Sequence, residues 1–111
     1  MLANDGRHEG RGIISSESVR EMTRDQTAGL NNPEYGYGIA TKRNTFGHGG
    51  AYSTMTLYDQ DTRLITGFLV QQVKWHKEGG KVSGEFQKAA AKTFFGTAAA
   101  ESAVTPEGLA R

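Results

Sequence analysis

STMTLYDQDTRLITGFLVQQ, residues 53–72, has the pattern of two β-strands joined by a turn. In its first half Met55 and Leu57 alternate with Thr54, Thr56 and Tyr58. This period of two is typical of a strand with one face on a core. The stretch therefore predicts an antiparallel hairpin whose first strand is half buried.

The second half of the stretch predicts the turn and the returning strand. Asp59–Thr62 has the carboxylates that hydrogen-bond their own backbone in turns. Leu64–Val70 is almost continuously apolar, so we expect a central strand covered on both faces.

Short aromatic and β-branched segments precede this hairpin. YGYGIATKR begins at Tyr35 and FGHGG at Phe46, with turn residues between them. Together the segments predict an antiparallel meander of three or four strands.

A helix is expected on each side of the meander. Residues 16–25 predict a short helix with Ser16 as its N-cap. After a loop over 73–82, EFQKAAAKTFF predicts a helix that ends at Gly96. Its expected buried face consists of Phe86, Ala89, Ala90 and Phe94. The predicted fold class is α+β, with the second helix packed on the sheet.

Composition and length narrow the organisation and the partners. A chain of 111 residues fits one domain, which we place at 1–96, with a disordered alanine-rich tail at 97–111. The net charge is +1 without a basic stripe, so nucleic acid is not an expected partner. The longest apolar run is far too short for a membrane segment, and the first residues lack the pattern of a signal peptide. The compartment stays undecided.

The segment with the most chemical content is FGHGGA, residues 46–51. It places one imidazole, His48, among residues with almost no side chain. Glycines weaken a strand, so they indicate close approach to the backbone, either by a bound substrate or by the chain itself in a bulge or turn. No cofactor is expected, and no metal, because the three histidines form no ligand pair and the chain has no cysteine.

The order of these segments resembles the C-terminal part of the serine β-lactamase and penicillin-binding-protein-like hydrolases, in the class C and esterase-like branch. The resemblance covers about residues 1–95 and is strongest from Tyr35 to Gln72. His48-Gly49-Gly50 matches the His-x-Gly form of the triad on the strand beside the active-site serine. The implied fold is part of the α/β sandwich of this family.

The resemblance also implies roles for individual residues. Ala51 would offer its backbone N–H to the oxyanion, and His48 would line the cleft and orient the substrate. Gly49, Gly50 and Tyr52 would be substrate-binding residues. Tyr35 and Tyr37, at strand spacing, are expected to pack on the sheet, with a place at the rim of a cleft as the alternative.

Two motifs of that family are missing. No serine of the chain is followed three residues later by lysine, and no tyrosine belongs to a Tyr-x-Asn or Tyr-x-Ser motif. Lysine in Ser-x-x-Lys makes the serine easier to deprotonate. Because both motifs precede the His-x-Gly strand in the family, N-terminal truncation is the simplest explanation, and the chain alone is expected to be inactive.

The sequence thus supports a first hypothesis and two alternatives. The first is one wall of a serine hydrolase whose substrate is a β-lactam, a D-peptide or a small ester. The second is a non-catalytic sheet module that recruits another copy or another chain through an exposed strand edge. The third, a small ligand-binding domain, would need a pocket that so few strands hardly enclose.

Overall fold

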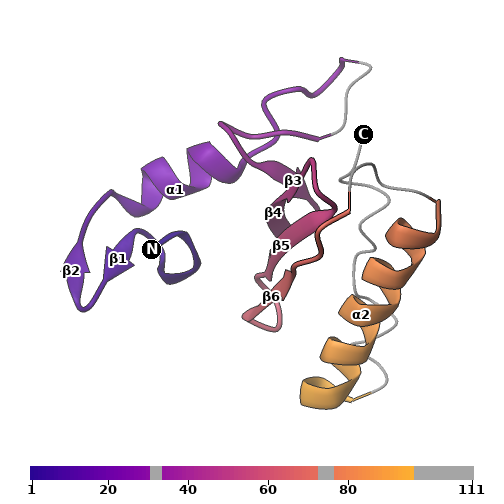
Figure 1. Cartoon of the computed structure of the whole chain (residues 1–111). Helices are drawn as coiled ribbons and strands as arrows, with labels where there is room; N and C mark the ends of the chain where they lie inside the picture. Colours follow the sequence, from indigo (N-terminus) through magenta and orange to yellow (C-terminus); the bar gives the residue numbers. More distant parts are fainter. Residues whose placement is uncertain (31–33, 73–76, 97–111) are drawn as a thin grey trace.

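The computed structural model describes residues 1–30, 34–72 and 77–96 of the chain. In chain order its elements are a 3-10 turn η1 (Leu2–Asn4), β1 (Arg7–His8), β2 (Arg11–Gly12), α1 (Ser16–Thr23), β3 (Ala40–Lys42), β4 (Thr45–Gly50), β5 (Thr54–Asp59), β6 (Leu64–Phe68) and α2 (Lys77–Phe95). Figure 1 shows the four-stranded sheet between the N-terminal elements on one side and α2 on the other. The predicted α+β class is confirmed.

The central sheet is an antiparallel meander in the order β3-β4-β5-β6, as the segment pattern predicted. A two-residue turn joins β3 to β4, with Arg43 at a φ of 52°. The predicted turn between β5 and β6 is also confirmed. The Asp59 carboxylate accepts hydrogen bonds from the N–H groups of Asp61 and Thr62, at 2.9 and 3.0 Å.

The alternation predicted for residues 54–58 decides which face of the sheet forms the core. Met55 and Leu57 are 1% and 5% exposed, and with Ala40 they form the core cluster of the described residues. Thr56, between them in sequence, is exposed on the opposite face. Alternate residues of β4 and β6 share these two faces, since facing residues on neighbouring strands lie on the same side of the sheet. Phe46 is an exception in burial: it lies on the face of Thr56 but is only 6% exposed, with its ring centroid 5.0 Å from that of Tyr58.

The expectation that Leu64–Val70 forms a central strand covered on both faces is wrong. β6 is the last strand of the sheet, and Ile65 is 61% exposed. Only Thr66 within this strand is buried, against α2. The error arose because a continuous apolar run does not show whether a second layer covers both of its faces.

The last helix packs on the sheet as predicted, but it is longer and buries a different face. It begins at Lys77, within the segment expected to be a loop, and ends at Phe95, with Gly96 in the left-handed region at a φ of 85° as the predicted cap. The buried stripe is Ser83, Gln87 and Ala91.

The stripe of α2 expected to be buried is largely exposed. Phe94 is 69% exposed and Phe86 38%, although the Phe86 ring still contacts that of Phe68, with centroids 5.7 Å apart. The predicted face was wrong because Gln87, a polar residue, is accommodated in the interior by a hydrogen bond with the Thr66 hydroxyl.

The first helix ends two residues earlier than expected and has a different cap. The Ser15 hydroxyl, not that of Ser16, accepts the hydrogen bond from the Ser18 N–H at 3.0 Å. Ser16 instead donates its hydroxyl to the carboxylate of Asp5. Ahead of the helix, β1 and β2 form a small antiparallel ladder of their own.

Two further observations concern the ends of the chain and the helices. Residues 97–111, predicted to be a disordered tail, lie outside the described residues. Within the described ranges, neither α1 nor α2 combines the length and the apolar character needed to cross a bilayer.

Packing predicts opposite effects for two glycine-to-alanine substitutions in the sheet. A Cβ at Gly47 would lie 2.0 Å from the Thr56 carbonyl oxygen, whereas a Cβ at Gly67 would have no neighbour within 4 Å. Gly47→Ala should therefore lower the free energy of unfolding by about 1–3 kcal/mol. Gly67→Ala should leave it unchanged or raise it by about 0.5 kcal/mol. Urea denaturation followed by circular dichroism measures both, and equal effects would contradict the packing of β4 on β5.

Candidate functional site

His48 lies on β4, as the motif predicted, and its side chain is exposed. It faces Thr56 of β5 on the side of the sheet opposite to the core. Thr56, in turn, faces Gly67 of β6, so the surface beside the imidazole is formed by small residues. An imidazole on a rigid strand, open to solvent on one side, can contact a ligand.

The partner of this imidazole is Tyr35, thirteen residues earlier in the chain. The Tyr35 hydroxyl is hydrogen-bonded to His48 Nε2, and the two rings meet edge to face with centroids 5.8 Å apart. His48 Nδ1 contacts the carbonyl oxygen of Gly49. Because a carbonyl can only accept, the neutral ring carries its proton on Nδ1, and Nε2 accepts the phenol proton. The chain itself thus fixes both the orientation and the tautomer of His48.

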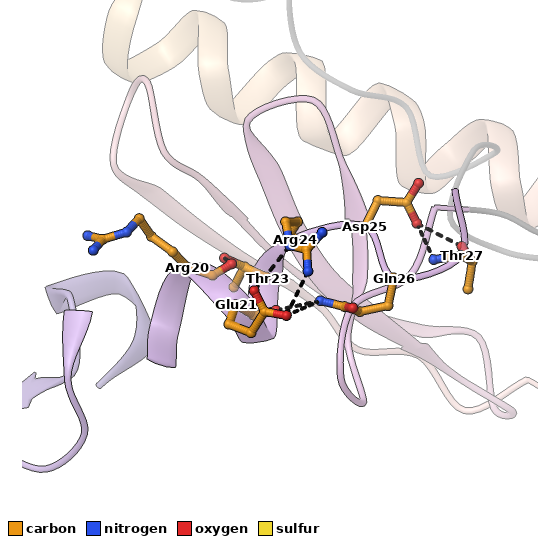
Figure 2. A network of polar contacts seen from close by, with 7 residues as sticks. All are labelled: Arg20, Glu21, Thr23, Arg24, Asp25, Gln26 and Thr27. Carbon is orange, nitrogen blue, oxygen red and sulfur yellow. Dashed lines mark hydrogen bonds and ion pairs between the residues drawn. The ribbon is translucent and has the colours of Figure 1, made fainter. Parts of the chain in front are cut away.

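Figure 2 shows a polar network that follows α1 and includes Asp25, Gln26 and Thr27. This network also positions Tyr35. One oxygen of the Asp25 carboxylate accepts hydrogen bonds from the N–H and the hydroxyl of Thr27, both at 2.8 Å, and from the Tyr35 N–H at 3.2 Å. The Gln26 N–H donates to the Tyr35 carbonyl oxygen at 2.7 Å. The tyrosine ring also packs on the core cluster. Backbone and ring are therefore both restrained.

The charges of this network have shifted pKa values. Hydrogen bonds from the hydroxyl and then the N–H of Thr27 lower the pKa of Asp25 below its ordinary 3.8. At the end of α1, the hydrogen bond from Arg24 lowers the pKa of Glu21, and the same contact, at 2.7 Å, raises the pKa of Arg24. All three groups are at the surface, where solvent screens such contacts, so each shift corresponds to a small contribution to stability.

The edge of β4 beside His48 is open. β3 pairs only with residues 45–47 of β4. The pairing ends where Ala40 of β3 lies opposite Gly47 of β4. The hairpin bond from the Ser53 N–H to the Gly50 carbonyl, 3.0 Å long, shows that Gly50 points its main-chain groups to β5. Since these groups alternate in direction along an antiparallel strand, those of Gly49 point to the other side, beyond the end of β3.

The turn after β4 holds Ala51 and Tyr52, both exposed. Ser53 closes the turn with a φ of 58° and is almost completely buried. Its hydroxyl donates to the Gln72 carbonyl at 2.9 Å, and the Gln72 N–H donates to the Tyr52 carbonyl at 3.2 Å. The segment after β6 thus fixes the turn that carries the expected oxyanion donor.

The structure gives a specific reason for two of the glycines in the motif. A Cβ at Gly47 would collide with a backbone carbonyl of β5, and one at Gly50 would lie 2.3 Å from the Thr54 hydroxyl oxygen. A Cβ at Gly49 would only touch the Met55 methyl, at 3.3 Å. The close approach that the sequence indicated is therefore made by β5 at Gly47 and Gly50.

The predicted site residues are contiguous along β4 and its turn: His48, Gly49, Gly50, Ala51 and Tyr52. Sequence reasoning gave Tyr35 a packing role and missed its hydrogen bond to His48. No spacing in the sequence could show it, because the contact depends on the path of residues 34–40. Tyr37, in contrast, is 58% exposed.

The described residues contain no group of three histidine, aspartate or glutamate side chains arranged to hold a metal ion. No protein-family model matches this chain, and no curated protein matches it.

The first prediction for this site concerns pH. The pKa of folded Asp25 is depressed, so its ionised form stabilises the fold above pH 3.8, and this contribution is lost as the pH falls through the lower folded value. Urea denaturation of the wild type should show this loss below about pH 4. Asp25→Asn keeps an acceptor without titrating, so it should lose less stability over the same range. An identical acid profile would mean that Asp25 does not hold Tyr35.

The second prediction concerns the tautomer of His48. Tyr35→Phe removes the hydroxyl that donates to Nε2, so the imidazole should change from the Nδ1–H tautomer to a mixture of the two. Nitrogen-15 chemical shifts of the ring above pH 8 report the change, and Tyr37→Phe is the control. If the ring already samples both tautomers in the wild type, the described hydrogen bonding is wrong.

Proposed function

We propose that this chain supplies one wall of the acyl-transfer site of a serine hydrolase of the β-lactamase and penicillin-binding-protein-like kind. The observation that carries the proposal is the open half of β4. His48 lies on this half of the strand, and the main-chain groups of Gly49 point to the unpaired side of β4. Ala51 follows in a fixed turn.

The open edge supports the binding of an extended acyl group. A substrate with an amide or ester can lie along residues 48–50 and exchange main-chain hydrogen bonds with Gly49, as an added strand does. The Tyr35–His48 pair then lies beside the bound substrate, because the His48 side chain projects from the same strand, β4. This arrangement orients the scissile carbonyl without any change in the sheet.

Ala51 is the candidate for oxyanion stabilisation. In the turn from Gly50 to Ser53, the Ser53 N–H is already bonded to the Gly50 carbonyl. Among the described residues no backbone carbonyl accepts the Ala51 N–H, which remains available for a ligand. A backbone donor held in a rigid turn stabilises the negative oxygen that forms when a hydroxyl attacks a carbonyl.

The attacking hydroxyl is assigned to other polypeptide, because no serine of this chain belongs to a Ser-x-x-Lys motif. In the proposed reaction that serine forms an acyl-enzyme, and the wall described here holds the carbonyl. The substrate class stays a β-lactam, a D-peptide or a small ester.

The proposal predicts what is encoded next to the chain and what the chain does alone. The reading frame before residue 1 should encode Ser-x-x-Lys followed by Tyr-x-Asn or Tyr-x-Ser. The isolated chain should hydrolyse neither a chromogenic β-lactam nor a p-nitrophenyl ester above the buffer rate. Turnover by the isolated chain, or the absence of both motifs from the adjoining frame, would refute the proposal.

A substitution in the turn tests the oxyanion role directly in the polypeptide that carries both parts. Proline is favoured at the second position of such a turn, so Ala51→Pro removes the N–H and keeps the backbone path. We expect kcat to fall by about 10²–10³-fold. Ala51→Gly, which keeps the N–H, should retain activity within about tenfold of the wild type. Equal activity of the two variants would show that Ala51 is not the donor.

A further inference from the structure

The outer edge of β6 is an unprotected strand edge. β6 is the last strand of the sheet, and no strand within the described ranges pairs with its outer side. Residues 64–70 contain neither a charged side chain nor a proline. Natural sheets usually protect such an edge with lysine, proline or a bulge, because free N–H and C=O groups recruit another strand.

An apolar stripe of α2 lies next to this edge. Val82 and Phe86 are 50% and 38% exposed, one residue before the buried Ser83 and Gln87. Of the charged side chains described on the helix, those at positions 81, 88 and 92 lie away from this stripe at a helical spacing of about 100° per residue, whereas Glu85, three residues after Val82, lies beside it.

The direction of α2 places the stripe on the outer side of β6. Phe86 contacts Phe68 at the end of β6, whereas Ala91 and Leu64, at its beginning, line one small cavity. The helix therefore runs antiparallel to the strand. With the right-handed coil of an α-helix, residues one position before the buried stripe then point away from β5 and toward the free edge.

We propose that β6 pairs with β6 of a second copy of this chain, antiparallel and with the two-fold axis at Thr66. The pairing would join the two four-stranded sheets into one continuous sheet. Both α2 helices then lie on the same face beside the axis, and their Val82 and Phe86 stripes meet.

This register is self-complementary. The alternation that directs Thr66 to β5 leaves the main-chain groups of Ile65 and Gly67 pointing outward. In the dimer Ile65 of each copy lies opposite Gly67 of the other. Space is available there, because a Cβ at Gly67 would have no neighbour within 4 Å and Ile65 is 61% exposed. On the helix side, Leu64 meets Phe68 of the second copy.

A second copy fits this surface better than a charged partner would. Residues 64–70 at the strand edge present no charge to be matched, and the apolar helix stripe, with Glu85 as its one described charged neighbour, lies on the same side of the molecule. The site at His48 is on β4, two strands away from β6, so the dimer leaves it open. The proposal concerns the chain by itself, without the other polypeptide to which the hydrolase proposal assigns the attacking hydroxyl.

Cross-linking of single cysteines tests the register, because the chain has none of its own. Thr66→Cys puts both thiols on the two-fold axis, whereas Thr56→Cys, on the neighbouring strand, is more exposed but far from the axis. Under mild oxidation at about 10 μM protein, the 66 variant should form disulfide-linked dimer roughly 100-fold faster than the 56 variant. Equal rates, or faster linking through position 56, would overturn the proposal.

A second pair of variants keeps the test independent of any loss of folding at the buried Thr66. Ile65→Lys places a charge on the exposed edge, and Thr56→Lys places one on the same face of a central strand. Analytical ultracentrifugation should show a concentration-dependent dimer for the wild type and for Thr56→Lys, and monomer for Ile65→Lys. A wild type that stays monomeric up to about 200 μM, or that associates only with a different polypeptide, would overturn the second-copy assignment.

Discussion

The six-residue pairing of β4 with β5 is the constraint on which the rest of the structure depends. It brings Met55 and Leu57 onto the core side and, by the same alternation, turns His48 outward. The pairing is so close at Gly47 that no side chain fits there. It also sets the turn in which Ala51 lies. The fold and the candidate site are therefore two consequences of one strand register.

The sequence predicted those parts of the fold that local patterns determine. Alternation identified β5, the aspartates identified its turn, and a glycine identified the end of α2. Patterns failed where the outcome depended on what covers a surface. Leu64–Phe68 is apolar but lies at an edge, and α2 buries Gln87 in preference to Phe86 because Thr66 offers a hydrogen-bond partner. Such pairings between distant residues leave no trace in the periodicity of either segment.

The site shows the same division. The positions of residues 48–52 on one strand and its turn follow from their order in the chain, and the motif alone was enough to propose them. Tyr35 could not be proposed in the same way, because its contact with His48 requires the return of the chain after α1, held by Asp25. That network links a surface carboxylate, through Tyr35, to the tautomer of the imidazole on β4. The hydrolase proposal rests on the geometry of this wall and on the resemblance of its motif.

The central claim is that β4 has a paired half and an open half. Amide hydrogen exchange of residues 45–50 measures this most directly, because protection reports the hydrogen bonding of each N–H. The Gly47 N–H, opposite β3, should be strongly protected, while the Gly49 N–H two residues later should exchange close to the rate of an unstructured chain. Equal protection of Gly47 and Gly49 would show that another segment covers the edge beside His48, and the candidate site would not exist.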